Sequence, residues 1–302
     1  MTTLFDAPGT SPPNPFSTLI APLNLSSEET NPSPSALASV AAQITHAVTT
    51  STNPATSLWE LWDAIFIPTA TSRATHIPTL ALLSAIRAQP PSLPSNVDWN
   101  DDAVRELKSH VDETDGKLHW ETLPKFGWSW RDFHDILEAN REWKAGWQGA
   151  SFPTFVEFSA LLLQERGEKG EVHPINVFYA CSNILKTRET SGDEKKEDQE
   201  KDERKLTPEE VRAIDVRVVA TWLKFGGRVL WEADQAELRK HFGAALDWER
   251  DLWPKKDGLT RERWAFWAER LWGLGEDERF DEQLRTLVKE AAEVIEGLLE
   301  GK

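Results

Sequence analysis

The sequence predicts an all-α protein of roughly eight to eleven helices, packed as one irregular helical bundle with no significant sheet. Apolar residues recur at helical spacing in most segments, and several of these segments begin with residues that favour the start of a helix. No clear run alternates apolar and polar residues between hairpin turns, as an antiparallel sheet would require. A chain of 302 residues allows one or two domains, so two helical subdomains remain the alternative.

Two segments are too polar to be part of the bundle. Residues 1–32 are rich in Pro, Ser, Thr and Asn, and we expect a disordered N-terminal tail. Residues 188–205 contain only charged, small and polar residues, which predicts a disordered charged insertion. The all-α domain is therefore expected to span residues 33–302, and two subdomains would be joined at this insertion.

The helices in the first half of the domain are predicted from their ends. Ser and Asn are favourable caps and Pro suits the first helical position, whereas a Pro pair or a Gly stops a helix. These signals place helices from Ser33-Pro34, from Asn53-Pro54, over about 78–89, over 101–113 on the surface, from Trp130 with Ser129 as its cap, over 151–167, and after His173-Pro174.

The second half has the firmest boundary, at Leu206-Thr207-Pro208. Thr207 with Glu210 three residues later forms a capping box, which favours a helix where Val and Ile would otherwise suggest a strand. Gly226-Gly227 then indicates either a break in this helix or a close helix contact. Further helices are predicted from Thr260 to Gly275 and over 277–300.

The totals exclude several function classes. A formal net charge of −16 argues against nucleic acid and against anionic membranes as partners. The single cysteine, Cys181, excludes an internal disulfide and a thiolate metal cluster within one chain. We find no basic, apolar leader and no apolar run near the roughly 20 residues that span a bilayer, so we expect a cytoplasmic or nuclear protein.

Tryptophan is used heavily, with 15 Trp against one Tyr, and two clusters stand out. In RERWAFWAERLW (261–272), Trp264 and Trp267 are one turn apart on a helix, with Arg263 four residues before Trp267. This is the spacing of a core ridge, and a ligand platform with Arg263 holding an anion is the alternative.

The second cluster, GWSWRDFHD, places Trp128, Trp130, Arg131 and His134 around the expected helix start. A capped helix packed by a hydrophobic staple explains it, whereas an anion site at a helix N-terminus is the alternative. A shared site would require this cluster to approach the 261–272 helix.

The chain also carries a family resemblance. The order of HWETLPKFGWSWRDF, SFPTFVEFSALLLQERG, VFYACSNIL, VVATWLKFGGRVLW and GLTRERWAFWAERL resembles the fungal family catalogued as domain of unknown function 3632, over about residues 55–295. Its most specific pieces are Trp120 with Leu123-Pro124, and Arg263-Trp264 with Phe266-Trp267. The resemblance implies a helical fungal protein found inside cells and brings no activity, cofactor or catalytic residue. The N-terminal tail and the charged insertion depart from the pattern.

Catalytic signatures are missing from the sequence. No two of the seven His residues lie three to five apart on one helix, and we find no nucleophile elbow, phosphate loop or dinucleotide fingerprint. We therefore expect no metal and no cofactor, and a buried, inert Cys181. The favoured function is a non-enzymatic protein-interaction or scaffold module. The alternative is an enzyme or carrier for a small apolar, possibly anionic metabolite in a Trp-lined pocket between helices.

Overall fold

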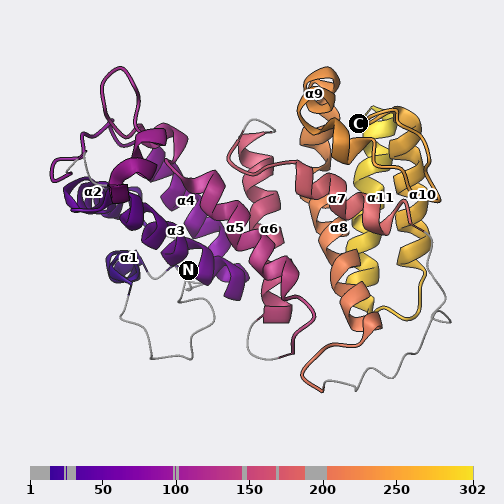
Figure 1. Cartoon of the computed structure of the whole chain (residues 1–302). Coiled ribbons are helices and arrows are strands. Elements are labelled where there is room, and N and C mark those ends of the chain that lie inside the picture. The colour runs from indigo at the N-terminus through magenta and orange to yellow at the C-terminus, as the bar shows by residue number, and fades with distance from the viewer. Residues whose placement is uncertain are drawn as a thin grey trace. The chain divides into compact units, whose positions relative to one another are not determined.

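The computed structural model describes residues 14–23, 25, 32–97, 99, 102–144, 148–167, 170–187 and 203–301. Over these residues the chain forms eleven α-helices and no strand, which confirms the all-α prediction (Figure 1). Contacts within the chain divide it into two compact units, Met1–Asp135 (unit 1) and Ile136–Lys302 (unit 2). The division falls inside a helix and not at the 188–205 insertion, of which residues 188–202 lie outside the described residues.

The elements of unit 1 are α1 (Pro15–Ile20), α2 (Pro34–Thr50), α3 (Pro54–Thr71), α4 (His76–Arg87), the first part of α5 (Phe126–Ala139), and the 3-10 helices η1 (Ala21–Leu23), η2 (Arg73–Thr75), η3 (Asp102–Ser109) and η4 (Trp120–Thr122). The unit is built around α3, which contacts α1, α2, α4, η2 and η3. The core forms where Trp62 and Phe66 of α3 meet the ring of Phe126 edge-on, at centroid distances of 5.1 and 5.0 Å.

Unit 2 is built around α8 (Pro208–Glu232), which has 25 residues. After the end of α5 come α6 (Gln148–Arg166), α7 (Ile175–Ile184), α8, α9 (Gln235–Leu246), α10 (Arg261–Gly275) and α11 (Glu282–Glu300). Helix α8 packs against α6, α7 and α11, and α10 packs against α11. α8 continues through Gly226 and Gly227 without a break, so the helix-break interpretation was wrong and close packing explains Gly226, which faces Leu163 of α6.

Local start signals placed several helices correctly. The side chains of Ser33, Asn53 and Thr260 each accept a hydrogen bond from a backbone N–H in the first turn of α2, α3 and α10. At α8 the full capping box forms, with Thr207 accepting from the N–H of Glu210 and the Glu210 carboxylate accepting from that of Thr207.

Part of the expected N-terminal tail is helical. Asn14 caps α1 through its side-chain oxygen, and its amide donates a 2.7 Å hydrogen bond to the carbonyl of Glu60 in α3. Phe16 and Ile20 are buried, so this segment gains apolar contacts that a count of its polar residues overlooks. The rest of residues 1–32, apart from positions 25 and 32, lies outside the described residues.

Two expected helices differ from the structure. The predicted surface helix over 101–113 is the 3-10 helix η3, and Asp112 follows it with a turn in which its carboxylate accepts from the N–H of Thr114. The helix expected to begin at Trp130 begins at Phe126 instead. Leu123 and Lys125 adopt left-handed backbone angles on either side of Pro124, and this tight turn starts the helix four residues early.

Candidate functional site

The tryptophan ridge on α10 lies in the core of unit 2. Trp264 and Trp267 are each only 1% exposed, and their rings meet edge-to-face at a centroid distance of 5.1 Å. Trp231 of α8 packs against Trp264 in the same manner at 5.8 Å. Trp272, further along the helix, is partly exposed and donates its indole N–H to Glu296 of α11. The buried rings stabilise helix packing and present no face to a ligand.

Arg263 is held by its own chain rather than being open to an anion. Its guanidinium is 1% exposed and donates to the carbonyl of Leu246 at 2.7 Å, to Asp257 at 2.7 Å and to the carbonyl of Lys255 at 3.3 Å. These bonds tie the end of α9 and the following loop to α10. The geometry therefore gives Arg263 a structural use.

The second predicted cluster is split between core and surface. Trp130 and His134 are buried with their rings 5.3 Å apart, whereas Trp128 is 70% exposed and Arg131 is exposed. Because α5 begins at Phe126, Trp130 lies beyond the first helical turn, whose N–H groups would hold an anion. This cluster belongs to unit 1 and the α10 ridge to unit 2.

A pocket of about 500 Å³ lies in unit 2, at a place that the sequence analysis did not single out. Its lining comes from α5, α7, α9 and the segment after α9: Glu138, Asn176, Tyr179, Asn183, Ala244 and Trp248. The three residues from α7 follow helical spacing, which places them on one face while Phe178 and Cys181 are buried. Tyr179 and Trp248 are 37% and 38% exposed and meet edge-to-face, with centroids 5.5 Å apart and planes at 88°.

The segment that carries Trp248 is fixed from both sides. Before it, Asp247 caps the C-terminal end of α9, pairs with Arg239 at 3.1 Å and accepts a hydrogen bond from the N–H of Gly258. After it, the guanidinium of Arg250 stacks 3.5 Å from the centre of the Trp248 ring and donates to the side-chain oxygen of Asn183 at 2.9 Å. The aromatic wall is therefore held in place before any ligand arrives.

Sequence reasoning missed this pocket because its residues carry no motif. Tyr179 is the only tyrosine of the chain, and the spacing of Asn176, Tyr179 and Asn183 is that of a polar helix face beside an apolar one. Trp248 is an isolated tryptophan outside the Trp-rich clusters. A lone aromatic residue on a polar face was the available signal, although it does not identify its distant partner.

A buried lysine in unit 1 is the strongest candidate for acid–base chemistry apart from the pocket. The Lys125 side chain is 0% exposed, lies 2.7 Å from a carboxylate oxygen of Glu106 and sits 4.3 Å from the centre of the Trp59 ring. Burial lowers the pKa of Lys125, while the hydrogen bond to Glu106 opposes that change. Since the ammonium group is enclosed, its contacts join η3 to α3 and leave no access for a substrate.

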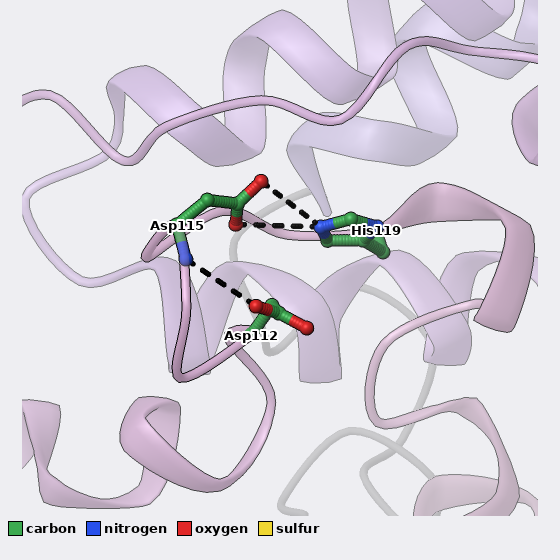
Figure 2. A group of neighbouring side chains, drawn as sticks. All are labelled: Asp112, Asp115 and His119. Carbon is green, nitrogen blue, oxygen red and sulfur yellow. Dashed lines mark hydrogen bonds and ion pairs between the residues drawn. The ribbon is translucent and has the colours of Figure 1, made fainter.

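Among the described residues, two carboxylate–histidine groups have the spacing of metal ligands. One consists of His134, Asp135 and Glu138 on α5, and the other of Asp112, Asp115 and His119. Asp112, Asp115 and His119 bring one ligand atom each within 4.8 Å of one another, on the turn between η3 and η4 (Figure 2). The His119 ring lies 3.3 Å from both oxygens of Asp115, and a hydrogen bond from the N–H of Lys117 lowers the pKa of Asp115. The set contains a single His, so the spacing of His residues in the sequence does not indicate it. Its oxygens accept backbone hydrogen bonds of the turn, which explains them without an ion.

Cys181 cannot act as an exposed nucleophile. The residue is fully buried on α7, and burial raises the pKa of its thiol, so the neutral form is favoured.

In the described part of the chain, no helix is long and apolar enough to cross a membrane.

Comparison with known proteins gives one match. The family model described as "Protein of unknown function (DUF3632)" matches residues 62–271, which include η4, the α10 ridge and the whole pocket. The match confirms the resemblance seen in the sequence, over a narrower range than expected. No curated protein and no solved structure matches the chain.

Proposed function

The chain belongs to the DUF3632 family of proteins of unknown function, and we propose that it is a non-enzymatic protein-interaction or scaffold module. In this proposal the pocket of unit 2 receives a segment of a partner protein. The cytoplasm or the nucleus is the proposed location, since a lone buried cysteine suits a reducing compartment. The net charge of −16 favours protein partners over nucleic acid or an anionic membrane.

The observation that carries the proposal is the combination of residues at the pocket. Trp, Tyr and Arg are the residue types that contribute most to protein–protein binding energy, and here Tyr179 and Arg250 each contact Trp248. Exposed aromatic rings leave apolar surface in contact with water, which is unfavourable until a partner covers the rings. Because Asp247 and Asn183 already fix this wall, little conformational entropy is lost on binding.

The size of the pocket supports a second function. A volume of about 500 Å³ falls in the range of roughly 300–1,000 Å³ that small-molecule sites occupy. An enzyme or carrier for a small apolar metabolite is therefore the alternative. Neither Arg131 nor Arg263, one of which would hold an anionic group in this alternative, lines the pocket, so the ligand would be bound by Tyr179, Trp248 and the two asparagines.

The test compares two surfaces of the same protein. The chain is used as bait in native extract, and any stoichiometric partner is purified and its Kd measured by titration calorimetry. We expect Trp248→Ala to weaken binding by about 30-fold, which corresponds to about 2 kcal/mol. Trp128→Ala, which removes an exposed tryptophan that does not line the pocket, should leave the Kd unchanged.

Two results would count against the interaction module. The first is the absence of a stoichiometric partner for the wild type and for a variant lacking residues 188–202. The second is a partner whose Kd responds to Trp128→Ala and not to Trp248→Ala. A thermal shift produced by a metabolite, and lost in Trp248→Ala, would favour the small-molecule alternative instead.

A further inference from the structure

We infer that the pocket of unit 2 binds a basic side chain, Arg or Lys, of a partner peptide. The same pocket also binds a backbone carbonyl of that peptide next to the basic residue. This inference rests on the proposed function and adds the chemistry of the occupant. It follows from three features of the pocket: its charged residue, its aromatic wall and its hydrogen-bond donor.

Glu138 supplies the charge. Among the described residues that line the pocket, it alone has an acidic side chain, and it is half-buried. A carboxylate at the wall of a partly desolvated pocket attracts a cation more strongly than a fully solvated one does. An acidic ligand would meet repulsion at the same place.

Tyr179 and Trp248 supply surfaces on which a cation can rest. Their planes are nearly perpendicular, so the two rings form a corner rather than a flat stack. The guanidinium of Arg250 already stacks on the Trp248 ring, 3.5 Å from its centre, so an incoming cation would use the part of the ring that is still exposed. Cation–π attraction is strongest for Trp and benefits from partial desolvation, and both conditions hold at this wall.

Asn176 supplies a donor that needs an acceptor. Its side-chain nitrogen is shielded from water and has no hydrogen-bond partner in the part of the chain that the structure describes. An unsatisfied buried N–H costs about 1–3 kcal/mol, and an incoming carbonyl oxygen would remove that cost. A peptide provides a carbonyl next to each side chain, whereas a simple amine does not.

The charge of the whole chain acts in the same direction. With 50 acidic residues against 34 basic ones, the long-range field favours approach of a basic segment and raises its association rate at low salt. The competing ligand chemistry is a carboxylate paired with Arg250. That guanidinium, however, already stacks on Trp248 and donates to Asn183.

The test uses a random 12-residue peptide library displayed on phage and selected on the full chain. Enriched sequences are synthesised, and their Kd is measured by fluorescence polarisation with the wild type and three variants. Glu138→Gln keeps the shape of the side chain and removes its charge. Glu249→Gln is the matched control, because Glu249 is an exposed acid one residue from Trp248 that does not line the pocket. Trp248→Ala reports whether the pocket is used at all.

We expect the enriched peptides to share an Arg or Lys. Glu138→Gln should raise their Kd by at least about 10-fold, and Glu249→Gln should raise it by less than about twofold. Two outcomes would overturn the inference but remain consistent with the interaction module. In the first, the peptides that depend on Trp248 share no basic residue. In the second, these peptides bind Glu138→Gln as tightly as they bind the wild type. If no enriched peptide depends on Trp248, both fail. If the wild type and Glu138→Gln have equal free energies of unfolding in urea, a weaker binding results from the lost charge and not from a disturbed fold.

Discussion

Lys186 and Arg263, two buried cations, donate to the same backbone carbonyl, that of Leu246, at 3.5 and 2.7 Å. Leu246 is the last residue of α9, where the partial negative charge of the helix is concentrated. Arg263 has a carboxylate partner in Asp257. For Lys186 the structure describes no ion pair. The two cations therefore differ in what their removal should do.

Arg263→Met should destabilise unit 2. The substitution leaves Asp257 without its partner and removes the bonds to the carbonyls of Leu246 and Lys255. Breaking a buried, hydrogen-bonded ion pair from one side costs about 3–5 kcal/mol, and the partial exposure of Asp257 places our expectation near the lower end. Urea unfolding followed by hydrogen exchange of α10 measures the loss. Arg228→Met, at an exposed pair on α8, should cost less than about 0.5 kcal/mol.

Lys186→Met should stabilise the protein at neutral pH. Burial, and secondarily the charge of Arg263, lowers the pKa of Lys186 to about 8. The unfolded chain keeps this proton up to about pH 10.5, so it binds more protons than the folded chain between pH 8 and 10.5, and wild-type stability should rise across that window. Below pH 8 the cost of the buried charge is fully present, on the order of 2 kcal/mol.

The measurement for Lys186 is the free energy of unfolding in urea from pH 7 to 10.5. In Lys186→Met the rise with pH should disappear, while the value at pH 7 exceeds that of the wild type. Lys240→Met removes an exposed lysine of α9 and should keep the wild-type slope. An unchanged slope in Lys186→Met would show that another group titrates.

Asp63→Asn should stabilise unit 1. Burial raises the pKa of Asp63, on α3, to about 6. Between pH 3.8 and 6 the folded chain binds the proton that the unfolded chain has lost, so stability falls as pH rises and the penalty is complete at pH 7. The asparagine variant should gain on the order of 1–2 kcal/mol at pH 7 and lose this dependence. Glu121→Gln, on the exposed side of η4, is the control and should follow the wild type.

The two adjacent glycines of α8 should respond in opposite directions to alanine. A Cβ at Gly226 would lie 2.8 Å from a terminal methyl of Leu163, whereas the nearest atom to one at Gly227 is 3.9 Å away on Val294. Gly227→Ala should therefore stabilise the helix by about 0.5–1 kcal/mol, and Gly226→Ala should destabilise it by about 1–2 kcal/mol. Thermal unfolding of the pair measures both, and a Gly226→Ala at least as stable as Gly227→Ala would contradict the close packing of α6 on α8.

The errors of the sequence analysis occur where distant residues set local structure. The start of α5 depends on the turn at Leu123–Lys125, whose central carbonyl, on Pro124, accepts a 2.9 Å hydrogen bond from the indole of Trp62. These residues are 62 positions apart, so Ser129 looked like the better cap. Helix α9 was not predicted, although Asp234 caps it, because its apolar residues are sparse. Helix α1 depends in the same way on its contact with Glu60.

The sequence by itself determined the all-α class, most helix starts and the aromatic ridges, because caps, prolines and helical periodicity act over a few residues. Only the tertiary structure decided how each side chain is used. It buried Trp264 and Trp267, committed Arg263 to three acceptors of its own chain, and brought Tyr179 to Trp248 at a pocket that neither segment predicts alone. The burial and the pairing of a side chain depend on which segments, distant in sequence, pack against each other. Local sequence patterns do not specify these contacts.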